Sequence, residues 1–469
     1  TAEHSINLKI NTTNKTGYTA SFSSKTEETA LLNTDPAINT KIDSISSDSA
    51  LANFPANTWG YRFDDNTVFS PIPAQSASVD LIKTTGKSTS EESHNIRLGM
   101  KLKSSLKPGN YENKLIVSVV SNPYTPKAIM TNGLDFNAKL KSLETATNKI
   151  EHFKKSTVAP AASMNVVNIE DEASDEEIKL WLDPTDKTAY YYTGPEKVYL
   201  NEDSSRMFYA SYSDSRIDNI LDLDLSNFDT SNVTDMNSMF AGLPNLTTLN
   251  LSSFDTSNVT NMKAMFAGLF RLTTLDLSNF DTSKVTDMSD MFSYMSSLTN
   301  LNLSNFDTSK VTGMSAMFSG MRNLTTLNLS NFDTSQVTRM NSMFSNMSNL
   351  TTLDLSNFDT SKVVNMDSMF LGMTNLTTLD LSNFDTSQVT NMAGMFALHH
   401  DDGLADRLEK IYVNNDFNTA SLTNFSEMFV HRKKLRGGNG SFLANPSTAD
   451  KSWLRVDRPG VQGYFTRKP

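Results

Sequence analysis

The chain has 469 residues, more than one hydrophobic core ordinarily supports, so two or more domains are expected. Its formal net charge of −11 and its pI near 5.1 argue against nucleic-acid binding, because nucleic-acid-binding proteins present a basic surface. The sequence contains no cysteine, which excludes disulfides and thiolate metal sites. No run of about 18 apolar residues occurs, so no membrane insertion is expected in this stretch.

Residues 1–125 are predicted to form an all-β domain of the immunoglobulin-like sandwich type. Polar and apolar residues alternate in residues 5–10 and 95–102, and other short strand-like runs lie between them. Several short strands at this spacing are typical of a two-sheet sandwich. If the domain resembles those of surface pilins and adhesins, Lys9 and an asparagine near Asn113 are the pair to examine for an isopeptide bond. The alternative is an ordinary exposed lysine on a strand.

Residues 126–163 are predicted to form a helical linker. Five residues follow one another at alternating steps of four and three, which places them on one face of a helix. These residues are Phe136, Leu140, Leu143, Thr147 and Ile150. Residues 157–163, rich in Ala and Pro, complete the linker. Residues 164–221 are then predicted to cap the first exposed edge of a repeated structure.

Nearly the same 26-residue segment occurs seven times between Leu223 and Phe396. Each copy carries a marker phenylalanine, at Phe228, Phe254, Phe280, Phe306, Phe332, Phe358 and Phe384. A fixed period of this size indicates stacked repeats, none of which buries a core alone. The sequence therefore predicts a solenoid of repeats over residues 222–429.

Within one repeat, Leu275 and Leu277 alternate with polar residues, which predicts a short half-buried strand. Steps of three and four residues then connect Val285, Met288 and Phe292, which predicts a short helix with a buried face. One strand and one short helix per repeat is the plan of a leucine-rich-repeat solenoid. The repeated methionines are interpreted as core residues rather than as a metal or recognition surface.

Residues 430–469 are predicted to cap the other end of the solenoid. This segment concentrates cations, among them Arg432 and Arg458, within an acidic chain. We interpret them as a solvated surface of the cap rather than as a site for an anionic polymer.

The repeated segment closely resembles the leucine-rich repeats of BspA-like bacterial surface proteins. The shared motif is Leu-x-x-Leu-x-Leu-Ser-x-Phe-Asp-Thr-Ser-x-Val-Thr-x-Met-x-x-Met-Phe, and the resemblance covers residues 197–465, with a degenerate eighth copy at 408–429. It implies an extracellular protein of the bacterial cell surface or cell wall, often associated with adhesion, with signal and anchor segments outside this chain. The chain departs from general leucine-rich repeats at one position. Those repeats carry a ladder of asparagines there, whereas this chain has Phe280 and its equivalents. A phenylalanine spine is therefore predicted to replace that ladder.

The motifs of common enzymes are missing from the sequence. There is no phosphate-binding loop, nucleophile elbow or dinucleotide fingerprint. The repeated aspartates share one environment, so nothing separates two carboxyl pKa values for acid–base catalysis. Residues 399–402, His-His-Asp-Asp, are interpreted as a solvated loop, since adjacent residues rarely converge on one metal. A non-enzymatic protein without cofactor or metal is expected.

The polar residues of the predicted strands form the candidate binding face, on the concave side of the solenoid. It comprises Asn250, Thr274, Asp276, Asn302, Thr326, Asn328, Thr352, Asp354, Thr378 and Asp380. Eight strands about 4.8 Å apart would span roughly 40 Å, enough for a host or bacterial cell-surface protein or glycan. Two interpretations stay open. A monomer binds a repetitive partner by many weak contacts, or the solenoid is a structural spacer or display stalk, with recognition by the N-terminal domain or elsewhere.

Overall fold

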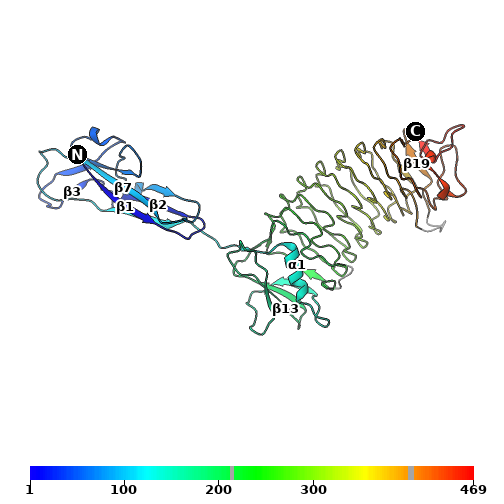
Figure 1. Ribbon diagram of the computed structural model, residues 1–469, viewed down its shortest axis with the longest axis horizontal. Helices are drawn as coiled ribbons and strands as arrows, with labels where there is room; N and C mark the ends of the chain where they lie inside the picture. Colours follow the sequence, from blue (N-terminus) through cyan, green and yellow to red (C-terminus); the bar gives the residue numbers. More distant parts are fainter. Residues whose placement is uncertain (212–215, 400–405) are drawn as a thin grey trace. The chain divides into compact units, whose positions relative to one another are not determined.

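The computed structural model describes residues 1–211, 216–399 and 406–469. The chain divides into two compact units, Thr1–Thr125 and Pro126–Pro469 (Figure 1). Each unit has its own hydrophobic core, and the two are described separately below.

The first unit consists of two β-sheets. Its elements are β1 (Ala2–Ile10), β2 (Tyr18–Ser24), β3 (Leu31–Asn33), β4 (Lys41–Ser44), η1 (Leu51–Asn53), β5 (Thr58–Phe63), η2 (Gln75–Ala77), β6 (Val79–Lys83), β7 (Glu92–Lys101), β8 (Tyr111–Glu112) and β9 (Leu115–Ser121). The strand orders are β1-β7-β5-β4-β3-β8 and β6-β2-β9. Phe22 of the smaller sheet contacts Tyr61 of the larger, with ring centroids 4.6 Å apart, in a core that includes Trp59 and Ile96. The unit is strand-rich, as its alternating sequence indicates.

The structure gives Lys9 and Asn113 different partners. The Lys9 ammonium lies 2.7 Å from the Glu91 carboxylate on the surface. The Asn113 side-chain amide donates to the backbone carbonyls of Glu28 and Ala30, at 2.9 Å each. Because an isopeptide bond requires the ammonium to meet the amide carbon, these two residues do not form the predicted pair.

The second unit begins with an N-terminal cap, residues 126–221, of short strands and one helix. Its elements are β10 (Ala128–Ile129), α1 (Gly133–Ser142), β11 (His152–Lys155), β12 (Val166–Asn168), β13 (Lys179–Asp183), β14 (Thr188–Tyr192) and β15 (Val198–Tyr199). They join the first repeat, through β16 (Asp222–Leu223) and β17 (Phe228–Asp229), in sheets ordered β12-β13-β14-β11-β16 and β10-β15-β17. Figure 1 shows α1 and β13 beside the first coils of the repeats.

The predicted helical linker is wrong, because α1 is short and is built into the core of the N-terminal cap. Asn132 caps its first turn by accepting a hydrogen bond from the Asp135 backbone N–H at 3.0 Å. Phe136 is fully buried and packs against Phe153 and Phe208, with ring centroids 5.8 and 5.3 Å apart. With ten residues, against about 20 for a membrane span, α1 does not cross a bilayer, nor does any other helix of the described ranges.

The hydrophobic stripe continues past the end of α1 without a helix. The buried Glu144 carboxylate accepts hydrogen bonds from the backbone N–H groups of Ile150 and Ile217, at 3.0 and 3.1 Å, and pairs with Lys149 at 3.0 Å. These contacts turn the chain, so Ile150 enters the core from a loop. Helical spacing in the sequence therefore extends beyond the helix itself.

The repeats form a stack of coils with no helix in their described residues, which overturns the predicted leucine-rich-repeat fold with a helix in each repeat. Backbone N–H groups donate to the next coil: those of Met288 and Asp290 bond the carbonyls of Gly313 and Ser315, at 3.0 and 2.7 Å. Asp290 and Tyr294 have φ values of 59°, in the left-handed region, which interrupts any α-helix. Successive turns place side chains at steps of three and four, as a helix does, and this ambiguity misled the prediction.

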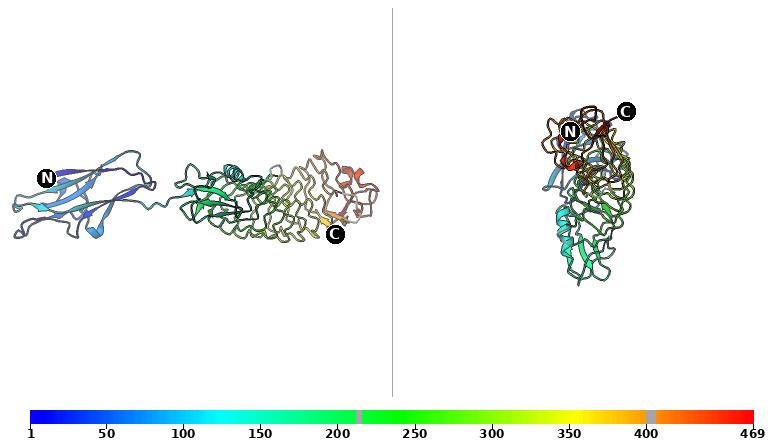
Figure 2. Two further views of the ribbon diagram at one scale, coloured as in Figure 1. Left: turned by 90° about the horizontal axis from the view of Figure 1, so that it is seen from below. Right: turned by 90° about the vertical axis from the view of Figure 1, so that its right-hand side faces the viewer.

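Isolated parallel bridges connect the coils, one position per coil. The bridged residues are Asp203, Asp235, Asn261, Asp287, Gly313, Arg339, Asn365, Asn391 and Asn424. We call this arrangement the coil stack, and Figures 1 and 2 show its coils following one another toward β19. The predicted strands appear as regular strands at its two ends, in β16 and β17 and in β18 (Thr378–Asp380).

Two rows of phenylalanines run through the core of the coil stack. Phe292 stacks on Phe266 and Phe318, with centroids 5.9 and 6.0 Å apart and planes within 12° of parallel. The marker Phe280 leans against Phe266 at 6.3 Å and 41°. The neighbouring Met288 is fully buried, as are its equivalents, which confirms the core role predicted for the methionines.

The coil stack also contains an asparagine ladder, so the prediction that phenylalanines replace it is wrong. The Asn279 side-chain amide donates to the backbone carbonyls of Leu251 and Phe254 in the preceding coil, at 3.0 and 2.7 Å. The same pair of contacts recurs at Asn305, Asn331, Asn357 and Asn383. Each asparagine directly precedes a marker phenylalanine, so the ring faces the core while the amide bonds the neighbouring coil.

A buried threonine ladder supports a first prediction. The Thr308 hydroxyl donates to the Asp333 carbonyl at 2.9 Å and accepts from the Asp333 N–H at 2.8 Å. Thr308→Val is expected to lower the free energy of unfolding by about 1–3 kcal/mol, because it leaves two part-buried backbone groups unpaired. Thr308→Ser, which keeps the hydroxyl, is the control. Urea denaturation measures both, and equal stability of the two variants would contradict the prediction.

The C-terminal cap covers the last coil. It comprises β19 (Lys410–Val413), η3 (Pro446–Thr448), η4 (Lys451–Trp453) and β20 (Phe465–Arg467), and β19 lies between β18 and β20 in a parallel sheet. Phe465 packs on Phe417, and Tyr464 on Phe429, with ring centroids 4.7 Å apart in both pairs. These rings close the open edge that the last coil would expose.

Candidate binding face

The polar residues predicted to face outward lie on one side of the coil stack. All ten predicted side chains are exposed except Asp380, which is half-buried. The leucines between them pack against the core: Leu353 and Leu379 are buried, and Leu275 and Leu327 are half-buried. The alternation of leucine and polar residues thus positions this face, although most coils lack a regular strand here.

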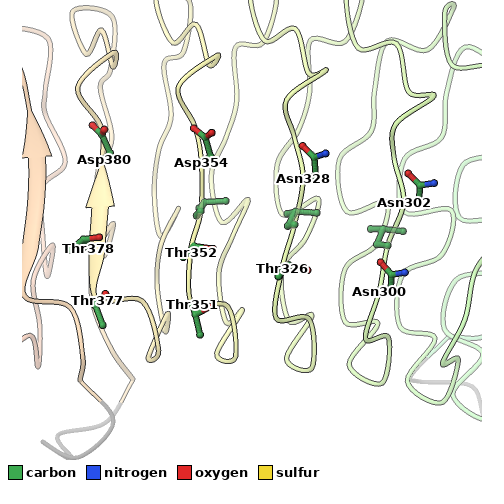
Figure 3. Close-up of a pocket in the computed structure, with 13 residues that line it drawn as sticks. Asn300, Asn302, Thr326, Asn328, Thr351, Thr352, Asp354, Thr377, Thr378 and Asp380 are labelled. Carbon is green, nitrogen blue, oxygen red and sulfur yellow. The ribbon is translucent and has the colours of Figure 1, made fainter.

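A hollow of about 600 Å³ lies on the face across four successive coils (Figure 3). Its polar lining consists of Asn300, Asn302, Thr326, Asn328, Thr351, Thr352, Asp354, Thr377, Thr378 and Asp380. Leu301, Leu327 and Leu353 complete the lining. Figure 3 shows Asn302, Asn328, Asp354 and Asp380 as one row across the coils.

The structure gathers seven of the ten predicted residues in this hollow. The other three, Asn250, Thr274 and Asp276, lie on earlier coils, outside the hollow. Thr351 and Thr377 were not among the predicted residues, yet both line the hollow. The repeated Thr-Thr pair was the signal for them, because a coil that is not a regular strand can expose two consecutive side chains.

A tight turn fixes each acidic or amide side chain of the row. Asp354 Oδ1 accepts a hydrogen bond from the Ser356 backbone N–H at 2.9 Å, and Asn328 Oδ1 accepts one from Ser330 at 3.0 Å. Such turns restrict the side-chain rotamer and leave the second polar atom of each group available. The face therefore presents hydrogen-bonding groups in fixed positions.

The row carries carboxylates at one end of the hollow, and the C-terminal cap neutralises one of them. The Lys468 ammonium lies 2.7 Å from Asp380. Burial would raise the pKa of Asp380, but this ammonium and the hydrogen bonds from Ser382 lower it overall. Asp354 has no ion pair within 4.0 Å among the described residues, so its charge stays available to a ligand.

Lowered carboxyl pKa values give a second prediction. Hydrogen bonds from the serine two residues further along lower the pKa of Asp276, Asp281, Asp307, Asp354 and Asp359. Since the folded pKa values lie below the unfolded value of about 3.9, this stabilisation is present above pH 4 and disappears as the pH falls through the folded values.

We therefore expect the urea midpoint to stay level down to about pH 4 and then to fall. A variant with Asn at Asp281, Asp307 and Asp359 is expected to show a weaker fall over the same range, because three titrating groups are gone. Midpoints measured between pH 7 and pH 2 test this, and identical pH profiles for the two proteins would refute it.

The predicted histidine loop lies mostly outside the described residues. His399 is described, and its Nε2 lies 2.7 Å from the Asn346 side-chain oxygen, two coils earlier. His400, Asp401 and Asp402 fall in the part of the chain that is not described.

Comparison with known proteins identifies the repeated region. The family model described as "Mycoplasma protein of unknown function, DUF285" matches residues 202–326 and again residues 312–437. No curated protein and no solved structure matches the chain significantly. The two matches together cover residues 202–437, half of the 469 residues, and the chain therefore belongs to the DUF285 family.

Proposed function

We propose that this chain is a non-enzymatic protein of the bacterial cell surface that binds a repetitive protein or glycan through the candidate binding face. The observation that carries the proposal is the hollow of about 600 Å³ that crosses four coils. Turns hold its polar side chains in place, so a ligand would not need to order them.

The composition of the face favours a polymer over a compact small molecule. Successive coils offer nearly the same hydroxyl, amide and carboxylate groups, which suits a ligand that repeats along its own length. The lining has no aromatic residue, and aromatic residues dominate compact protein hot spots. Many weak contacts made together can still give strong attachment.

The extracellular location is part of the same proposal. It rests on the resemblance of the repeat motif to BspA-like bacterial surface proteins. That resemblance goes beyond membership of the DUF285 family, which by itself says nothing of location. Attachment to a host or bacterial surface is the role we infer from that resemblance.

Binding of the full chain to glycan and surface-protein arrays tests the proposal. Thr352→Arg places a long side chain in the hollow and is expected to reduce binding at least about tenfold, which equals 1.4 kcal/mol. Asp354→Asn removes a charge but keeps the turn, since Asn occupies the equivalent position at Asn328. Gln336→Arg, at an exposed residue outside the hollow, is the matched control. Binding that Thr352→Arg leaves unchanged would refute the assignment of the face.

A deletion separates binding from spacing. Removing residues 307–358 takes out two whole repeats and joins equivalent positions. A multivalent binder is then expected to lose attachment, because the contacting area shrinks. A spacer whose recognition lies elsewhere would keep its attachment per molecule, and that outcome would favour the display-stalk function.

A further inference from the structure

The N-terminal cap contains a second hollow, of about 490 Å³, separate from the candidate binding face. It lies between the Ala- and Pro-rich segment 156–161 and two paired strands, β13 and β14. Trp181 comes from β13 and Tyr190 from β14. The volume falls within the range of small-ligand sites, about 300–1,000 Å³.

An aromatic pair forms one wall of this hollow. Trp181 and Tyr190 are directly opposite in the antiparallel register, so both side chains project from the same face of the sheet. Their rings stack with centroids 5.8 Å apart and an angle of 28° between planes. Met164 and Pro160 also line the hollow, so its surroundings combine aromatic and apolar groups.

Two polar groups at the hollow have hydrogen-bonding capacity left. Trp181 is only 4 % exposed, yet its indole N–H makes no hydrogen bond within the described part of the chain. Unlike the hydroxyl of the neighbouring Tyr191, this nitrogen is not closed off from solvent, so its N–H is accessible to a ligand. Asp183 uses Oδ1 to accept from the Thr185 N–H and hydroxyl, at 2.9 and 2.6 Å, and its Oδ2 makes no such bond among the described residues. One donor and one acceptor are therefore open beside the ring pair.

We propose that this hollow binds a neutral sugar ring. The C–H face of a pyranose packs on an aromatic surface, and its rim hydroxyls both donate and accept hydrogen bonds. The Asp183 carboxylate would accept from one hydroxyl, and the indole N–H of Trp181 would donate to another. The proposal does not depend on the candidate binding face, since the two hollows share no residue.

The local charges favour a neutral ligand over an ion of either sign, because one ammonium and one carboxylate, Lys155 and Asp183, line the hollow. Lys155 lines the hollow, and its ammonium donates to the backbone carbonyls of Pro195 and Glu196, at 2.6 and 2.5 Å. A fixed ammonium repels a second cation such as a quaternary amine, which would otherwise suit an aromatic pair. A neutral polyol meets no such repulsion.

Saturation-transfer-difference NMR with the full chain tests the proposal. The probes are the methyl β-glycosides of glucose, galactose and N-acetylglucosamine. At least one is expected to receive saturation. Tyr190→Ala is expected to abolish the signal, and Asp183→Asn, which keeps the turn to Thr185 but replaces the acceptor Oδ2 by a donor, is expected to reduce it at least about threefold. Tyr190→Phe keeps the ring and loses the hydroxyl that donates to Asp186, so it should retain the signal.

Two controls make the result specific. Trp453→Phe alters a tryptophan that packs at a tilt against Tyr464 in the C-terminal cap, and it should leave the signal unchanged. Thermal unfolding of each variant shows whether the fold persists. If Tyr190→Ala does not fold, the signal of Asp183→Asn decides whether the hollow binds the glycoside. No saturation of any glycoside, or a signal of undiminished strength in the deciding variant, would overturn the proposal.

Discussion

Arg432→Met is expected to lower the free energy of unfolding by about 3–5 kcal/mol, because it leaves a buried carboxylate without a counter-charge. Arg432 is 1 % exposed, and its guanidinium lies 3.1 Å from the fully buried Asp406. The same guanidinium donates to the carbonyls of Met373, at 3.2 Å, and Phe396. Burial lowers the pKa of Arg432, although the nearby carboxylate opposes that shift.

Arg458→Met is the matched control for this prediction. Arg458 forms a bidentate pair with Asp416, at 2.8 and 3.0 Å, but both side chains are about 40 % exposed. Its loss should cost about 0–1 kcal/mol, as for other surface pairs. Chemical denaturation compares the two variants. Equal losses would show that the Arg432 pair is not the buried anchor that the geometry describes.

A double variant completes the test. Replacing Arg432 by Met and Asp406 by Leu removes both charges, so much of the stability lost in Arg432→Met should return. If the double variant is as unstable as the single one, the hydrogen bonds to Met373 and Phe396 carry the stabilisation instead of the charge pair.

This anchor also marks a limit of the sequence analysis. The cations of the C-terminal cap were interpreted as a solvated surface, yet Arg432 is one of the largest fully buried side chains of the described chain. Its partner Asp406 lies 26 positions away and follows the segment that interrupts the repeat pattern. Long-range pairs of this kind leave no periodic signal, so composition alone cannot separate a buried cation from an exposed one.

The repeat period and the identity of the core residues were predictable, because burial follows the 26-residue spacing. The backbone between them was not. Residues such as Asp290 adopt left-handed φ values that their residue type does not predict. At Gly320, with φ 75°, the residue type itself indicates such a conformation. The asparagine ladder was also missed, since Asn279 and its equivalents resemble ordinary turn residues.

The row of Asn and Asp on the candidate binding face was predictable from the sequence, because its members alternate with leucines that pack against the core. The hollow in the N-terminal cap was not predictable from the sequence. Trp181 and Tyr190 are nine residues apart, and only the antiparallel register of β13 and β14 brings them together. Pairing between strands of a non-repeated region depends on the tertiary fold, which the local pattern does not specify.

The second large effect is expected at the centre of the coil stack, where Phe318→Ala should cost about 3–5 kcal/mol. Phe318 is fully buried, and its ring stacks on Phe292 and Phe344, 6.0 Å away on each side. Removing the ring opens a cavity and also ends three aromatic contacts, the third with the tilted ring of Phe332 at 6.4 Å, each worth about 0.5–1.5 kcal/mol beyond its buried area. Phe442→Ala is the control, because that ring is 52 % exposed and should contribute less than about 1 kcal/mol.

The loss at Phe318 should also change how the protein unfolds. Each coil contacts only its neighbours, so a weak central interface allows the two halves of the stack to unfold separately. We therefore expect a lower midpoint together with a smaller dependence of the unfolding free energy on urea. Phe429→Ala, at the last stacked ring, should release mainly the C-terminal cap and leave the central coils cooperative. Circular dichroism with hydrogen exchange separates the two patterns, and identical exchange protection in both variants would contradict the nearest-neighbour view of the stack.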